Sequence, residues 1–405
     1  MSIRLLQSAA VMAAILSTAA EAAGDSSFNP AISLILDGRY GSFDNDSDYE
    51  LPGFMLGGEA GRGEEGFYLG HNELVLSANA DDLFYGNLTA AIAEHDGETE
   101  VELEEAYIET LGLGYGISAK AGRFLLGLGY LNQQHSHAWD FSDAPLIYRG
   151  LFGDQLIDDG LHLSWVAPTP MFVKVGAEFT RGERFPAGGA SNDGIGASTL
   201  FAKVGGDLGE SQAWQLGISH WRAEIEGRTS GGHDHHEGEE GGHETPTYSG
   251  DSDVTGIDFV WKWSPYGNAT ERNLKIQGEY FIRNEDGDVV MDDESDEPES
   301  STYDGEQKGG YLQAVYQFMP RWRVGLRYDW LDSDNKGSDE EVLAEAGLDN
   351  EGHTPQRFTL MGDYSHSEYS RVRLQFARDE SYEDKDNIIT LQYVVSLGSH
   401  GAHQF

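Results

Sequence analysis

Residues 321–331 read RWRVGLRYDWL, and this alternation limits the fold of the chain more than any other feature. Successive side chains of an extended strand point to opposite faces, so one face here is wholly apolar and the other is mostly charged. The apolar members are Trp322, Val324, Leu326, Tyr328 and Trp330. Such a strand is too apolar on one side for water and too polar on the other for a packed core. It fits a wall between lipid and water.

The same period of two recurs in about sixteen segments along the chain. They begin near residues 30, 66, 83, 99, 114, 160, 170, 197, 212, 252, 270, 308, 321, 356, 369 and 387. Short links alternate with longer polar ones, and the segment near Trp214 to Glu226 changes phase as a β-bulge would. The longest links span about 40–65, 127–159, 181–196, 227–251, 284–307 and 333–355. We therefore predict an all-β fold, a transmembrane antiparallel β-barrel of about 16 strands with short periplasmic turns and long extracellular loops.

A soluble β-sandwich or propeller is the alternative fold, but it would bury parts of the face that carries arginines. The chain has no cysteine, so no disulfide can hold a sheet of this size together. A closed barrel needs none, because closure removes the sheet edges and satisfies the backbone in lipid.

The two ends of the chain also fit export to an outer membrane. Residues 1–22 carry Arg4, an apolar run and a small-x-small pattern, which predicts a cleaved signal peptide; an anchor helix is the other interpretation. Residues 23–405 would then form the barrel. Counting back by twos from Phe405 continues the apolar phase of the last strand, which resembles the signal that barrel assembly machinery recognises.

Charge restricts the partners. The 26 Lys and Arg stand against 70 Asp and Glu, a formal net charge of -44. This balance argues against nucleic acid and favours cations near the surface.

Several short stretches resemble known families. Residues 103–108 (LEEAYI) and 120–124 (KAGRF) are similar to the porin-like barrel superfamily that includes phosphate-selective porins. Residues 132–141 (NQQHSHAWDF) and 397–405 (LGSHGAHQF) resemble proteobacterial proteins labelled zinc-regulated, TonB-dependent outer-membrane receptors. The resemblance implies a porin-like barrel and a link to zinc. TonB coupling needs a plug domain, for which the sequence leaves no room before the first strand, so passive passage is the expected mechanism.

Residues 231–244 read GGHDHHEGEEGGHE, within a predicted extracellular loop. Imidazole and carboxylate groups suit zinc, copper or nickel, and glycines would let the chain wrap an ion. The candidate ligands are His233, His235, His236, Glu237 and His243. The alternative is a solvated low-complexity loop without a ligand.

The predicted loop 127–159 lies where porins often fold a loop inward. Its His135 and His137 would share one side if locally extended, which suggests a second metal contact; two polar loop residues beside packed aromatics are an equally weighted alternative. Acids of this loop would face arginines of the lumen across a constriction; the alternative is that any water-filled lumen has to be lined with charge. The candidate pore-lining residues are Asp140, Asp143, Arg321, Arg323, Arg327, Arg371 and Arg373.

The sequence therefore predicts an outer-membrane channel of a Gram-negative bacterium that passes small hydrophilic solutes, divalent metal ions such as zinc among them. No cofactor is required, and no G-x-S-x-G, P-loop or H-E-x-x-H motif suggests an enzyme. Lipid and lipopolysaccharide are expected partners, and analogy alone suggests a homotrimer. One rival is a surface binding or adhesion barrel with little conductance; another is an outer-membrane enzyme whose catalytic pair leaves no linear motif.

Overall fold

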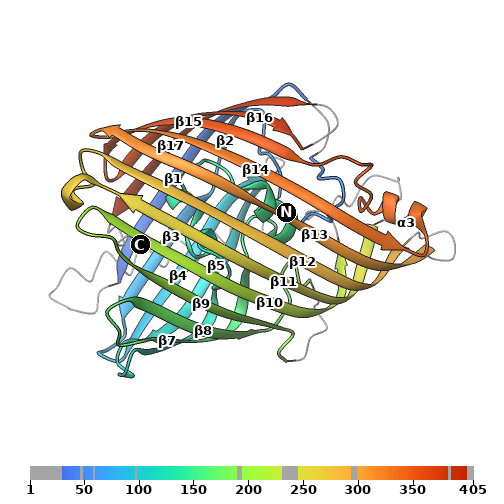
Figure 1. The fold of residues 1–405 in the computed structure, drawn as a ribbon, viewed down its shortest axis with the longest axis horizontal. Helices are drawn as coiled ribbons and strands as arrows, with labels where there is room; N and C mark the ends of the chain where they lie inside the picture. Colours follow the sequence, from blue (N-terminus) through green and yellow to red (C-terminus); the bar gives the residue numbers. More distant parts are fainter. Residues whose placement is uncertain are drawn as a thin grey trace.

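The computed structural model describes residues 30–45, 49–57, 60–95, 98–188, 194–229, 245–292, 299–381 and 385–398. Three sequence predictions lie outside these residues: the signal peptide at 1–22, the metal ligands of 231–244, and the terminal Phe405. The described chain forms one antiparallel sheet that closes into a barrel (Figure 1).

Seventeen strands are present in the described ranges. They are β1 (Ala31–Ser42), β2 (Gly66–Leu69), β3 (Asn72–Asn79), β4 (Phe84–His95), β5 (Glu98–Thr110), β6 (Ile117–Leu125), β7 (Ile157–Val166), β8 (Phe172–Thr180), β9 (Ala197–Asp207), β10 (Gln212–Thr229), β11 (Thr245–Trp263), β12 (Asn273–Asp292), β13 (Glu299–Met319), β14 (Trp322–Gly337), β15 (Gln356–Ser367), β16 (Ser370–Glu380) and β17 (Asp386–Gly398). The helices are short: η1 (Leu131–Gln133), η2 (Ser136–Ala138), α2 (Leu146–Phe152), η3 (Pro265–Gly267) and α3 (Glu340–Glu345). No helix of the described chain is both long enough and apolar enough to cross a membrane.

The barrel has sixteen strand positions, as predicted, because β2 and β3 share one. Both pair with β1, and the strand between them is interrupted at Gly70 and His71. On its other side β1 pairs with β17, which completes the ring. The predicted irregularity in β10 is present as a register shift between Ile225 and Arg228.

Two predicted loops are shorter than expected. Strand β12 continues to Asp292 and β13 begins at Glu299, so most of the predicted loop 284–307 is strand. Likewise β11 begins at Thr245, which takes seven residues from the predicted loop 227–251. The sequence was misleading because acidic residues occupy the outward positions there. Strand pairing does not require an apolar outer face once the strand has left the lipid.

The outer surface of the barrel changes from apolar to acidic along the long strands. Toward the short turns, the outward side chains form an apolar band typical of a lipid-facing wall. The band includes Leu216, Ile218, Ile257, Phe259, Leu312, Val324, Leu326, Phe358, Leu360, Leu374 and Leu391. Farther along, Asp286 lies directly opposite Asp251 on one side and Asp304 on the other. The long strands β10–β14 therefore extend beyond the band with an acidic outer face.

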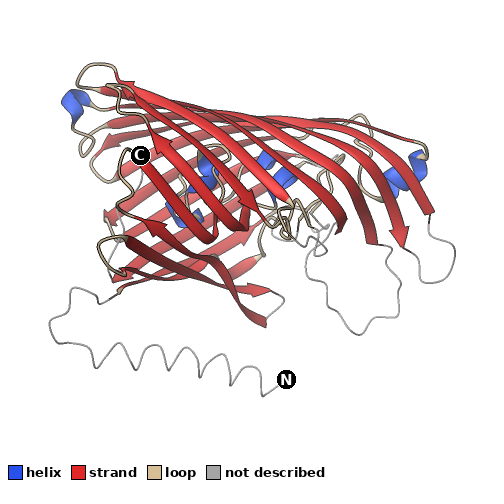
Figure 2. Cartoon of the chain, turned by 90° about the horizontal axis from the view of Figure 1, so that it is seen from below, coloured by secondary structure: helices blue, strands red, loops and turns tan. Residues whose placement is uncertain are grey.

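The interior of the barrel is occupied by chain rather than by water alone. Residues 126–156, which we call the inner loop, connect β6 to β7 and carry η1, η2 and α2 within the ring of strands (Figure 2). Tyr148 of α2 packs edge-on against Phe281 of β12, with ring centroids 5.7 Å apart. Both belong to one large buried apolar cluster shared by the inner loop and the wall. The loop is thus part of the barrel's core.

Candidate functional site in the barrel lumen

The inner loop is attached to the wall by ion pairs. Asp140 accepts from Arg323 Nη1 at 2.9 Å and from Lys275 Nζ at 3.0 Å. Burial alone would raise the pKa of the Asp140 carboxyl, but Lys275 and Arg323 outweigh burial and hold the pKa well below its usual range. Asp140 is therefore an anionic anchor between β12 and β14.

Asp143 is a second anchor with more partners. Its carboxylate lies 2.6 Å from Arg357 Nη2, 3.1 Å from Arg327 Nη2 and 3.2 Å from Arg149 Nη2. Gln375 Nε2 donates to the same group at 2.8 Å. Burial opposes the ionised form, yet the three guanidinium groups keep the pKa of Asp143 well below its usual range.

Two further arginines bind the backbone of the loop. Arg371 donates to the carbonyl of His137 at 2.8 Å, and Arg373 donates to the carbonyl of Trp139 at 2.8 Å. Arg327 and Arg373 are only 1% exposed. Arg327 and Arg373 therefore do not face the open lumen, contrary to the prediction that they line a pore, whereas the Asp143 side chain is 13% exposed and its assignment stays a prediction. The reason is that the loop packs onto the arginines directly instead of leaving water between them.

Below the inner loop, a cavity of about 1140 Å³ extends to the end of the barrel with the short turns; we call it the vestibule. Asp140, Arg321, Arg323 and Arg371 line it, as do His135 and His137. Its charges are segregated. Glu73, Glu105, Glu109 and Glu178 come from β3, β5 and β8, whereas Lys262, Lys275, Arg323 and Arg371 come from β11, β12, β14 and β16. The exceptions are Lys120 and Lys174 on the acidic side, and Asp140 and Glu368 on the basic side.

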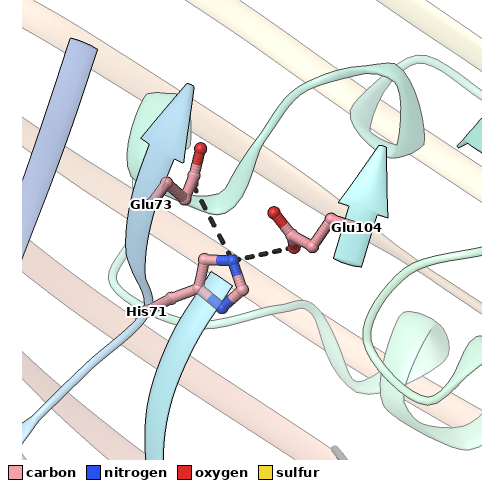
Figure 3. A group of neighbouring side chains, drawn as sticks. All are labelled: His71, Glu73 and Glu104. Atoms are coloured by element: carbon pink, nitrogen blue, oxygen red, sulfur yellow. Dashed lines mark ion pairs between the residues drawn. The ribbon is translucent and has the colours of Figure 1, made fainter. Parts of the chain in front are cut away.

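One wall of the vestibule is lined by Glu73, Glu105, His135 and His137. Beside Glu73 lie His71 and Glu104 (Figure 3). His71 Nε2 lies 2.8 Å from Glu104 Oε1 and 3.9 Å from Glu73 Oε1. His135 of the inner loop approaches the same pair, with Nδ1 at 3.5 Å from Glu73 Oε2 and 3.7 Å from Glu104 Oε2. We call His71, Glu73, Glu104 and His135 the luminal cluster.

Two irregularities of the sheet assemble this cluster. In the β4–β5 pair, Thr89 faces Glu105 and Ala90 faces Leu103, so Glu104 is an extra, bulged residue. The bulge lets Glu104 and Glu105 both reach the interior, which regular alternation forbids. Between β2 and β3, Leu69 faces Gly38 and Glu73 faces Ile35, which leaves one extra residue on that strand as well. His71 lies in this interruption.

Two neighbouring side chains orient the cluster. His137 Nδ1 lies 2.7 Å from Glu73 Oε1, and Glu105 Oε2 lies 3.0 Å from His135 Nε2. The expectation of a locally extended segment around these histidines is wrong: His135 immediately precedes the short helix η2 and His137 lies within it. Their rings are nevertheless stacked, with centroids 5.8 Å apart, and both reach the wall glutamates.

Sequence reasoning found His135 and His137 but missed their wall partners. His71, Glu73, Glu104 and Glu105 are far away in the chain. The one available signal was the adjacent pair Glu104-Glu105, which breaks the alternation of β5. Chemically, the cluster offers imidazole nitrogens and carboxylate oxygens, the donor types that first-row transition metals prefer.

Known structures define the class of fold. The outer-membrane channel DcaP of Acinetobacter baumannii has a TM-score of 0.54 at 12% identity, covering 91% of this chain and 97% of that one. A loop L8 deletion mutant of the outer-membrane protein OmpT of Vibrio cholerae has a TM-score of 0.53 at 11% identity, covering 92% and 100%. The chain thus has the fold of a porin-like β-barrel.

Sequence comparison gives the family. A relative from Aquifex aeolicus (strain VF5), described as "Uncharacterized protein", is 31% identical over 409 residues, which cover 93% of this chain and 80% of the relative. The chain belongs to the same family as this protein. A comparison with models of known families found no match.

Proposed function

We propose that this protein is an outer-membrane channel of a Gram-negative bacterium through which small hydrophilic solutes diffuse passively. The observation that carries the proposal is the vestibule, a cavity of about 1140 Å³ inside a closed barrel, with acidic and basic residues on opposite walls. Opposed charges create a transverse field that orders water and separates polar solutes by charge and dipole. A purely structural barrel has no need of such a field.

The inner loop controls the width of this path. Asp140 and Asp143 hold it against β12, β14 and β15 by direct ion pairs. Solute passage then depends on how much the loop yields or how closely water and solute can pass beside it. Binding along the path must be weak and spread over several sites, because a solute that binds tightly cannot leave.

We extend the proposal to divalent transition metals, zinc above all, as part of the cargo. The net charge of -44 favours cations. Residues 231–244 connect the ends of β10 and β11 opposite the short turns, which is the extracellular side of a porin-like barrel. Their histidines and acids would raise the local concentration of metal at the mouth. Lipopolysaccharide, barrel assembly machinery and a homotrimeric state belong to the same proposal, whereas catalysis does not.

The test is single-channel conductance of the purified protein in a planar bilayer, with and without micromolar zinc. Wild type should conduct, and zinc should perturb the current. In a variant without residues 231–244 the current should persist while the effect of external zinc becomes weaker. Current that ignores zinc in both proteins would leave a general porin. Absence of current would overturn the channel and favour the rival, a surface binding barrel.

A further inference from the structure

We propose that the luminal cluster binds one divalent transition-metal ion, with zinc as the best fit, and that this ion fastens the inner loop to the barrel wall. The inference deepens the proposed function by naming a regulatory site on the path. The effect of the ion on transport rests on the proposed function, whereas the binding site itself is argued from geometry alone.

The first argument is the spacing of the ligand atoms. Ligands about 2.0–2.2 Å from a tetrahedral Zn²⁺ lie roughly 3.3–3.6 Å from one another. One ligand atom each from His71, Glu73 and Glu104 already lie within 4.8 Å of one another. His135 Nδ1 adds contacts of 3.5 and 3.7 Å to the two glutamates. His71 Nε2 faces the Oε1 atoms and His135 Nδ1 faces the Oε2 atoms of the same two glutamates, so an ion between the rings would have two nitrogens and two carboxylates as ligands.

The second argument is that the buried carboxylates are incompletely satisfied. Glu73 Oε2 and Glu104 Oε2 are buried and accept no hydrogen bond. The side chain of Glu73 is fully buried and that of Glu104 is 7% exposed. Buried polar atoms are rarely left without a partner, because the loss of hydration is not compensated. Their nearby nitrogen is His135 Nδ1, at 3.5 Å from Glu73 Oε2 and 3.7 Å from Glu104 Oε2. These separations are long for a hydrogen bond and close to those between two ligand atoms of one ion.

The third argument is the support around the ligands. Metal-binding histidines generally donate their other ring N–H to a carboxylate or carbonyl, which fixes the tautomer. His135 has this arrangement, since its Nε2 lies 3.0 Å from Glu105 Oε2 while its Nδ1 faces the two glutamates. Glu73 is oriented in turn by His137 at 2.7 Å. A chance cluster of polar side chains would not be expected to provide both the ligand atoms and the side chains that orient them.

The origin of the ligands explains the fastening. His71, Glu73 and Glu104 belong to the wall, whereas His135 belongs to the inner loop, 31 positions beyond Glu104 in the chain. An ion held by all four would therefore link the loop to wall strands other than β14, β15 and β16, which carry its arginine contacts. Metal occupancy would add a fastening to those contacts and slow the movement of the loop.

The experiment uses the full barrel without residues 231–244, so that external histidines do not contribute. Zinc binding is measured by equilibrium dialysis, and hydrogen exchange of the amides of residues 130–144 is measured with and without zinc. We expect one bound zinc per chain and slower exchange of the loop when zinc is present. Absence of stoichiometric zinc binding would overturn the site.

Three variants distinguish zinc binding by the wall residues from the fastening of the loop. H71Q and E104Q should each weaken zinc binding at least about tenfold, the effect typical of disturbing a metal's ligand shell. H135Q should retain weak binding by the wall residues but should lose the zinc-dependent protection of the loop. The matched control is H220Q, because the ring of His220 lies on the outer face beside Thr255. This variant should bind zinc as the unsubstituted barrel does. Resistance to urea and the heat-dependent shift on gels establish that each barrel has folded.

The outcomes also separate this inference from the channel. Binding and hydrogen exchange require no current, so a protein that binds zinc at the cluster but does not conduct would overturn only the proposed function. A conducting protein whose zinc binding is unchanged by H71Q and E104Q would overturn only the metal site. If zinc binds tightly but does not change hydrogen exchange of the inner loop, the proposal that the ion fastens the loop is overturned.

Discussion

Asp143 on the inner loop lies 2.6 Å from Arg357 on β15, and the same carboxylate also pairs with Arg327 and Arg149. One acidic side chain thus contacts three buried guanidinium groups from two wall strands and a helix. Of these, Arg327 also pairs with Asp329 and Arg357 with Asp379. This carboxylate joins the loop's apolar core to the charged wall. Its removal should affect both stability and transport.

We predict that Asp143→Asn destabilises the barrel by about 3–5 kcal/mol, because removing one partner leaves buried charge uncompensated. The same change should raise single-channel conductance, since the loop loses its anchor. Urea unfolding in lipid vesicles and bilayer recording measure the two effects. The control is Asp334→Asn on the exposed pair with Lys336, which should change neither. A variant as stable as wild type would contradict the structural role given to Asp143.

The two loop aspartates also predict a pH dependence. Their folded pKa values are depressed by the basic wall residues, while unfolded Asp titrates near about 3.9. Their contribution to stability is therefore complete above about pH 5 and is lost as the pH falls below about 4 toward the folded pKa values. Urea midpoints of wild type and of Asp140→Asn should differ most at pH 7 and converge in acid. A constant difference from pH 7 to acid would show that Asp140 is not held ionised by Lys275 and Arg323.

Charge selectivity should follow the two walls of the vestibule. Lys262→Gln removes a positive charge from the basic side and should shift the reversal potential in a salt gradient toward cation preference. Glu109→Gln removes a negative charge from the other side and should shift it toward anions. Equal shifts in the same direction would mean that these residues do not act through the field across the lumen.

The polar contacts of α2 give a prediction for the core. Tyr148 donates to Glu279 Oε2 at 2.8 Å and accepts from the Asn132 backbone N–H at 3.1 Å. Tyr148→Phe leaves the buried Asn132 N–H without this acceptor and takes one donor from Glu279 Oε2, which keeps the Tyr130 N–H at 3.1 Å. The change should cost about 1–3 kcal/mol. Tyr266→Phe, at a side chain 90% exposed, is the matched control. Unchanged urea midpoints for Tyr148→Phe would mean that water replaces the lost hydroxyl.

The sequence predicted the wall of this protein far better than its interior. Lipid imposes an apolar side chain at every second position, so the strand from Trp322 to Trp330 could be recognised locally. The luminal cluster could not, because His71 and Glu104 meet only when β2 to β5 are placed side by side. The arginines were assigned to the correct face, but whether Arg327 contacts water or the loop depends on how the inner loop folds.

The bulge in β5 has an evolutionary consequence. A strand normally cannot lose one residue, because every later side chain would move to the opposite face. Here Leu103 and Ala106 occupy the outward phase on either side of two inward glutamates, so deletion of Glu104 would restore regular pairing and leave the lipid face intact. A single codon gained or lost could thus add or erase this carboxylate while the barrel survives. Relatives that differ by one residue at this position would be a natural record of the site's appearance or loss.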